Sequence, residues 1–141
     1  DERIKIMTLP SGPVPSFPNT TGLQDGRALN KLAGLMGSVC TITAKAGGTK
    51  AAATEITGVK CLIDVCATNG DSALLPPGYP GLEITIFNAG AANAQIFGSG
   101  SDTINEIATG TGVTQNAGIS AVYTCYSVVA GVGIWGRTLS A

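Results

Sequence analysis

Short runs of alternating apolar and polar residues fill the chain from Val39 onward. They are rich in β-branched residues and are separated by glycine, asparagine or proline about every 8–12 residues, a spacing typical of sandwiches and barrels. In LEITIFN (82–88), the leucine and both isoleucines share one face, as expected for a half-buried strand. The pattern predicts an all-β body over residues 39–141, a single small β-sandwich or β-barrel of about eight strands.

Turn residues lie between the expected strands. Asn69-Gly70-Asp71 is a strong turn signal, and AGVG (130–133) suits a hairpin. No segment recurs at a fixed period, so a solenoid is not predicted. The longer strands are expected in VCTITAK (39–45), KCLIDVCAT (60–68), LEITIFNAG (82–90), NAQIFGSG (93–100), SAVYTCYSVV (120–129) and VGIWGRTL (132–139), and the shorter ones in AAATEITG (51–58), DTINEIATGTGVTQNAG (102–118) and, as an edge piece, SALL (72–75).

Residues 1–38 follow another pattern and are expected to form an extended N-terminal arm. The segment MTLPSGPVPSFPNTTG (7–22) holds four of the seven prolines, which fix φ and remove backbone donors, so polyproline character is expected there. Further on, the residues Leu29, Leu32, Ala33 and Met36 have helical spacing. One short helix is therefore the alternative to a wholly extended arm.

The chain is poor in charge. Charged residues make up 12% of it, about half the usual share of a soluble domain. Such a chain is expected to bury part of its surface against copies of itself or a lattice. The net charge of -1 divides into +3 over residues 1–60 and -4 over residues 61–141. This division suggests partners of opposite charge at the two ends, with scattered surface charge as the alternative; it favours neither nucleic acid nor membrane.

Candidate chemistry is sparse. The cysteines Cys40, Cys61, Cys66 and Cys125 form no C-x-x-C pair and the chain has no histidine, so zinc is disfavoured and buried free thiols in a reducing compartment are expected. Asp71 and Asp102 are expected to cap turns. An enzyme that uses Asp64, Asp71 or Asp102, and a calcium-binding turn, are the alternatives. The expectation is no catalytic residue, no cofactor, no metal and no small-molecule substrate.

Aromatic residues are the best candidates for contacts between subunits, because they are enriched at interface centres. Tyr123 and Tyr126 are three apart on one expected strand, so one should point inward and the other outward. The candidate interface residues are Phe87, Phe97, Tyr126 and Trp135. For Trp135, packing in the core is the alternative.

The C-terminal half carries a resemblance. ATNGDSALLPPGYPGLEITIFNAG (67–90), followed by the DTIN turn at 102–105 and a last strand that contains a tryptophan, resembles small virion structural proteins of tailed bacteriophages. The likeness covers residues 67–141, with weaker support from AGGTKAAATEIT (46–57). It implies a head decoration (cement) protein or a tail-associated module, and it supplies no catalytic residues.

These expectations combine into one hypothesis. The chain would be a capsid decoration protein, a homotrimer that is assembled in the host cytoplasm, binds the outer surface of the head shell and clamps neighbouring subunits of the major capsid protein. The alternative is a tail-fibre or other tail-associated module that binds a receptor or glycan. The arm residues expected to touch coat or neighbouring subunits are Leu9, Pro10, Pro13, Val14, Pro15, Phe17 and Pro18.

Overall fold

The structure is a computed structural model that describes residues 37–140. Within that range the all-β expectation is confirmed, with ten strands rather than about eight and one short 3-10 turn. The predicted arm and its short helix lie outside the described residues. The elements are β1 (Val39–Thr43), η2 (Lys50–Ala52), β2 (Thr54–Glu55), β3 (Lys60–Val65), β4 (Asp71–Leu74), β5 (Glu83–Asn88), β6 (Ala94–Phe97), β7 (Thr103–Ile104), β8 (Val113–Gln115), β9 (Ser120–Val129) and β10 (Val132–Leu139).

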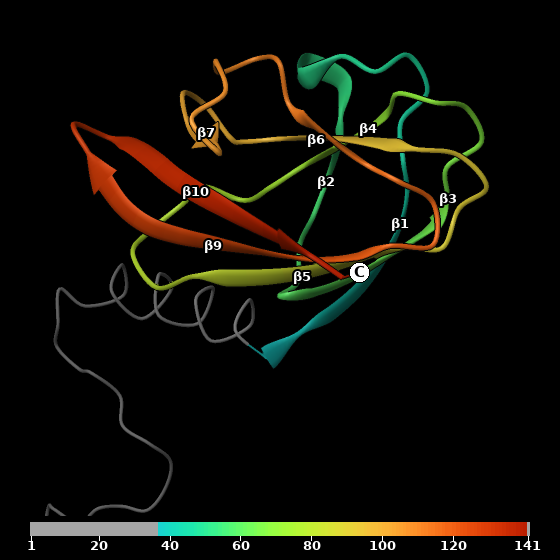
Figure 1. Cartoon of the computed structure of the whole chain (residues 1–141), viewed down its shortest axis with the longest axis horizontal. Helices are drawn as coiled ribbons and strands as arrows, with labels where there is room; N and C mark the ends of the chain where they lie inside the picture. Colours follow the sequence, from blue (N-terminus) through green and yellow to red (C-terminus); the bar gives the residue numbers. More distant parts are fainter. Residues whose placement is uncertain (1–36, 141) are drawn as a thin grey trace, which may run out of the picture. The chain divides into compact units, whose positions relative to one another are not determined.

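The strands form two sheets. Sheet A has six strands in the order β1-β3-β5-β9-β10-β7, and sheet B has four in the order β2-β4-β6-β8. Figure 1 shows them as two layers, with β5 and β9 in one and β4 and β6 in the other. Each sheet turns its apolar side chains toward the other, because strand residues alternate between faces and only one face can be buried here.

From β1 to β6 the chain winds between the two layers in a way that the sequence pattern did not predict. Strands β1, β3 and β5 are parallel neighbours in sheet A, and β2, β4 and β6 are parallel neighbours in sheet B. The coils differ in length: Val39 pairs with Lys60, 21 residues on, and Lys60 with Thr85, 25 residues on. Because the coils differ in length, no segment recurs at a fixed period in the sequence. The winding therefore cannot be recognised from the sequence pattern.

Strand β4 corrects a second expectation. The segment SALL was expected at a sheet edge, but β4 lies between β2 and β6 inside sheet B. Three of its four residues, Asp71, Ser72 and Ala73, are buried. The short run of small residues fits an inner strand because neighbouring backbones approach closely on both sides.

Strands β8, β9 and β10 have antiparallel partners, and β10 also pairs with β7 in parallel. Strand β8 pairs with β6, β9 with β5, and β10 with β9. The predicted hairpin between β9 and β10 is confirmed, and its two turn residues, Ala130 and Gly131, have φ of 52° and 81°. Positive φ at both positions matches the right-handed twist of the strands that the turn joins. The predicted turn at Asn69–Asp71 is also confirmed, with φ of 95° at Gly70.

The core lies between the sheets. The predicted alternation in LEITIFN is confirmed: Leu82, Ile84 and Ile86 are buried, whereas Phe87 is exposed. Tyr123 and Tyr126 also point to opposite sides as predicted, at 0% and 68% exposure. The largest fully buried side chains include Trp135, Tyr123, Ile63, Leu75, Ile84, Ile86 and Ile96.

A polar chain of hydrogen bonds also runs through this core. The Tyr123 hydroxyl donates to Gln115 Oε1 at 2.8 Å, and Gln115 Nε2 donates to the carbonyls of Ile86 and Ile119 at 2.9 Å each. Asn88 Nδ2 donates to the carbonyl of Gln115 at 3.0 Å. Buried polar groups cost free energy unless they are paired. The network therefore favours the one packing arrangement of the two sheets in which these donors and acceptors meet.

Cys61, Cys66 and Cys125 are buried free thiols, as predicted, and Cys40 is only partly buried. Within residues 37–140, no helix has the length and hydropathy required to cross a bilayer.

Candidate interaction surface

The outer surface of sheet A is the broad face that points away from sheet B. Strands β3, β5 and β9 form its centre, and their inward residues are buried while their outward residues are exposed or half-buried. We call the outward set the sheet A face. It consists of Lys60, Leu62, Asp64, Glu83, Thr85, Phe87, Ser120, Val122, Thr124 and Tyr126.

Strand register brings the apolar members of this face together. Phe87 lies beside Leu62 of β3 and Ser120 of β9. Thr85, two residues earlier on β5, lies beside Val122. Phe87 is 41% exposed although it sits on a central strand, so a large aromatic surface remains in contact with water. This exposure is consistent with the choice of Phe87 as a candidate interface residue, which stays a prediction.

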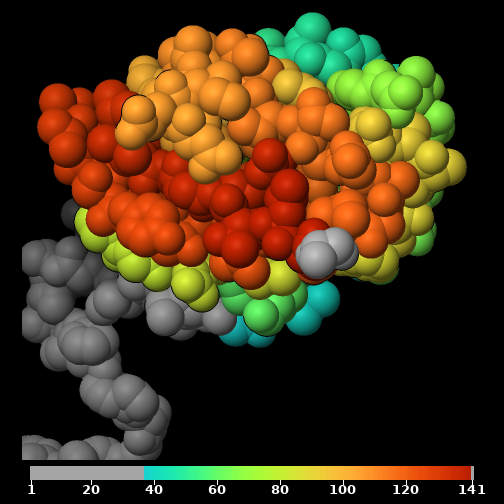
Figure 2. Space-filling model, viewed as in Figure 1, coloured from blue at the N-terminus to red at the C-terminus, as the bar shows by residue number. Residues whose placement is uncertain are grey.

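Tyr126 is the most exposed aromatic residue of the face, at 68%. Its ring lies on the backbone of β10, because a Cβ atom added at Gly136 would come within 2.7 Å of Tyr126 Cε2. The glycine therefore leaves room for the ring to lie close to the sheet. Figure 2 shows atoms of β9 and β10, in orange and red, at the molecular surface on the side that faces the viewer.

Three of the ten residues of the face are charged, and two of these hydrogen-bond to hydroxyls. Lys60 Nζ donates to Thr85 Oγ1 at 3.4 Å, and Thr124 Oγ1 donates to Glu83 Oε2 at 3.5 Å. The third, Asp64, is exposed, and the other seven residues are apolar or carry hydroxyl groups. Those seven cost less free energy to dehydrate than charged groups do.

Two of the predicted interface aromatics are buried in the core. Phe97 and Trp135 are 3% and 1% exposed, so the interface prediction is wrong for Phe97, and for Trp135 the alternative of packing in the core is confirmed. Trp135 is the register partner of the buried Cys125, and alternation along β10 turns both side chains inward. Phe97 packs against Gly112, where an added Cβ would lie 2.8 Å from the ring. Phe97, Trp135 and Phe87 all lie in β-rich segments, so the local sequence does not separate them. They differ in whether the side chain points toward the opposite sheet, which depends on the tertiary structure.

Trp135 belongs to a cluster around the buried carboxylate of Asp102. Trp135 Nε1 and the backbone N–H of Gly78 donate to Asp102 Oδ2 at 3.1 and 3.0 Å, and the Gly133 N–H donates to Oδ1 at 2.7 Å. The role predicted for Asp102, capping its own turn through its side-chain oxygens, is wrong: the donors lie 24 to 33 residues away in the sequence, and the carboxylate joins distant segments instead.

The other carboxylates named as alternatives have separate surroundings. Asp71 Oδ2 accepts from the N–H groups of Ala67 and Thr68 at 3.0 Å each, as predicted for a turn cap. Asp64 is exposed on β3. In the part of the chain that the structure describes, no three side chains of the His, Cys, Asp or Glu types gather as a metal-ligand group.

Burial governs the ionisation of the inner groups. It raises the pKa of the Tyr123 hydroxyl, against a smaller opposite effect of the Arg137 guanidinium. It likewise raises the pKa of the Cys61 thiol, with a further contribution from Cys40. Both groups are therefore neutral at pH 7.

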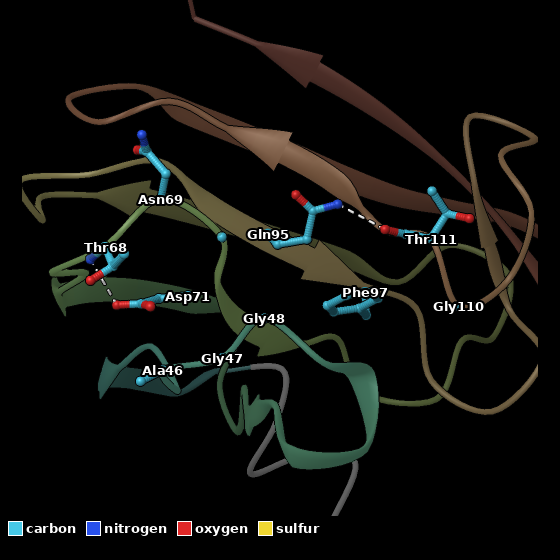
Figure 3. A pocket seen from close by; sticks show the side chains of 11 residues that line it. Ala46, Gly47, Gly48, Thr68, Asn69, Asp71, Gln95, Phe97, Gly110 and Thr111 are labelled. Carbon is cyan, nitrogen blue, oxygen red and sulfur yellow. Dashed lines mark hydrogen bonds between the residues drawn. The ribbon is translucent and has the colours of Figure 1, made fainter.

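A groove of about 410 Å³ lies over sheet B, away from the sheet A face. The loop at Gly47 and Gly48, the turn at Asn69 and the segment at Thr111 surround it, with Gln95 of β6 among them (Figure 3). Gln95 is held in place: its Nε2 donates to the Thr111 carbonyl at 2.8 Å. The groove is lined by amides, hydroxyls and backbone groups together with Asp71 and Phe97, a mixed lining that suits a polar ligand.

The arm residues predicted to contact a partner, Leu9 to Pro18, lie outside the described residues, so their role stays a prediction. No protein-family model matches the chain, and no curated protein matches it in sequence.

Proposed function

We propose that the chain is a head decoration protein of a tailed bacteriophage. It would bind the outer surface of the head shell as a homotrimer and clamp neighbouring subunits of the major capsid protein. The observation that supports this most is the sheet A face, where the side chains of Phe87 and Tyr126 are exposed on inner strands of a six-stranded sheet. The resemblance of residues 67–141 to small virion proteins supports the same role.

The physical basis of the proposal is the burial of apolar area on a surface that is already ordered. Each Å² of apolar surface removed from water stabilises a contact by about 25 cal/mol, before the costs of association. Because Phe87 and Tyr126 lie on β5 and β9, inner strands of sheet A, little backbone freedom is lost when they bind. A clamp of this kind stabilises the shell against expansion or rupture.

The test is reconstitution on particles that lack the protein. We expect the double variant Phe87→Asp/Tyr126→Asp to remain folded, to sediment as a monomer and to leave the shell largely unoccupied in electron micrographs. Both substitutions place a carboxylate where the interface would exclude water. Ala51→Asp/Ala52→Asp is the matched control, because both alanines are exposed on η2 and their replacement adds the same two charges outside the sheet A face. If the double variant decorates particles as well as the control does, the face is not the contact surface.

A tail-associated module that binds a receptor or glycan is the second candidate. The groove beside Gln95 favours it, since amides, hydroxyls and the carboxylate residue Asp71 line it and groups of these kinds hydrogen-bond to the hydroxyl groups of a saccharide. Gold-labelled antibody on intact particles separates the two roles. Label over the whole head supports decoration, whereas label confined to the tail tip contradicts it and supports the second candidate.

A further inference from the structure

Cys40 and Cys61 lie side by side in sheet A although they are 21 residues apart in the sequence. Cys40 on β1 is the register partner of Cys61 on β3 in the parallel ladder. Partners in a parallel ladder point to the same face, and adjacent strands are about 4.8 Å apart. That separation falls within the Cα spacing of about 4.4–6.8 Å that disulfides span.

The surroundings of the two thiols differ in a way that suits stepwise oxidation. Burial raises the pKa of the Cys61 thiol, and the neighbouring Cys40 raises it further. Cys61 is buried, whereas Cys40, on the edge strand of the sheet, is partly exposed. A small oxidant can therefore react with Cys40 first. The thiol that lies beside the oxidised Cys40 is then that of Cys61, its register partner.

The remaining thiols have no cysteine neighbour of this kind. Cys66 Sγ donates to the Thr68 carbonyl at 3.8 Å, and Cys125 Sγ donates to the Ser127 carbonyl at 3.5 Å. The register partner of Cys125 is Trp135. The fold therefore singles out one pair among the four cysteines.

We propose that Cys40 and Cys61 form a modification site, an oxidisable dithiol whose intramolecular disulfide fastens the edge strand β1 to β3. The site is independent of the proposed role in the virion. Its disulfide would close a loop that contains η2 and β2 and would restrict the unfolded chain, so the first coil of the fold gains resistance to unfolding.

The oxidant is a low-molecular-weight disulfide such as oxidised glutathione. The thiolate of Cys40 attacks one sulfur of this disulfide, forms a mixed disulfide and releases one small thiolate. Cys61 then loses its proton, attacks Cys40 Sγ and releases the second small thiolate. Two protein thiols are oxidised, one small disulfide is reduced, and the two protons from the protein are taken up by the two released thiolates.

The experiment uses the full chain, purified in reductant, freed of it and incubated in the native state with oxidised glutathione. We expect the intact mass to fall by two hydrogen atoms and the number of free thiols to fall from four to two. Cleavage after Lys and after acidic residues separates all four cysteines, because Lys45, Lys60, Asp64 and Asp71 lie between them at the required places. The expected product joins peptide 32–45 to peptide 61–64. The melting temperature of the oxidised chain should exceed that of the reduced chain.

Cys40→Ser supplies the control, since its partly exposed position lets the variant fold, which circular dichroism verifies. This variant should keep all three of its thiols under the same treatment. Three results would overturn the proposal: four free thiols after oxidation of the native chain, a stable glutathione adduct on Cys40, or a disulfide that includes Cys66 or Cys125.

Discussion

Asp102 joins three segments that lie far apart in the sequence. Its carboxylate accepts hydrogen bonds from Gly78 in the loop before β5, and from Gly133 and Trp135 on β10. Both glycines are required by space: a Cβ at Gly133 would lie 2.7 Å from Oδ2 of Asp102, and one at Gly78 would lie 2.9 Å from Cys125 Sγ. Since Asp102 is 6% exposed, its removal leaves donors that water cannot readily satisfy.

We expect Asp102→Ala to lower the free energy of unfolding by about 3–5 kcal/mol, because it leaves three donors around Asp102 without their acceptor. Asp102→Asn keeps one acceptor oxygen and should have a smaller effect. Urea unfolding followed by the fluorescence of Trp135, the single tryptophan, measures both. Asp64→Ala, at an exposed position, is the control and should change the free energy by less than about 0.5 kcal/mol. Equal midpoints for the two alanine variants would contradict the role of Asp102.

The buried thiol of Cys61 and the buried hydroxyl of Tyr123 predict that the free energy of unfolding falls at alkaline pH. Burial raises the pKa of Cys61 and Tyr123 above their ordinary values of 9.0 and 10.0, to which unfolding returns them. Below pH 8 both groups are protonated in both states and the free energy of unfolding should not depend on them. Above pH 9 the unfolded chain loses protons that the folded chain retains, so stability falls by up to about 1.4 kcal/mol per pH unit for each group.

Urea midpoints measured from pH 7 to pH 11, in the presence of reductant, check this prediction. Tyr123→Phe removes one of the groups and should reduce the slope above pH 10, whatever its effect on stability at pH 7. An unchanged slope in this variant would show that Tyr123 does not contribute.

Among the elements, the β9–β10 hairpin shows most directly how local sequence sets structure. Alternating residues on both strands and a glycine in the turn are sufficient to predict it. The turn nevertheless contains one unfavourable residue, since Ala130 has φ of 52° and carries a Cβ. The left-handed region costs an ordinary residue about 1–2 kcal/mol, and asparagine tolerates it better.

Ala130→Asn should therefore raise the free energy of unfolding by about 0.5–1 kcal/mol. Gly131→Ala is the matched comparison at the neighbouring position, where φ is 81°, and should lower the free energy by about 1 kcal/mol. Thermal unfolding measured by circular dichroism distinguishes the two signs. Similar melting temperatures for both variants would mean that the turn conformation does not limit stability.

At the scale of the whole molecule, the proposed function would use the predicted arm as a second region of contact with the shell, besides the sheet A face. We expect a chain that lacks residues 1–18 to fold, to keep its trimeric mass in analytical ultracentrifugation, and to occupy fewer sites on the shell. The reason is that the arm would add contacts with the coat, while the sheet A face would hold the subunits together. Unchanged occupancy in electron micrographs would remove the arm from the proposal, and loss of the trimer would place it between subunits.

The sequence by itself determined the features that depend on neighbouring residues. Alternation located the long strands and their buried sides, as in LEITIFN, and glycine and asparagine located the turns at Gly70 and Gly131. These features are local because strand periodicity and turn conformation arise within a few residues.

Only the tertiary structure decided which strands are neighbours. The parallel winding, the burial of Trp135 and the pairing of Cys40 with Cys61 all join residues that are separated by complete coils or facing sheets. Coils of unequal length leave no period from which those neighbours could be read. Their positions follow from the packing of two sheets into one core, which is a property of the whole chain.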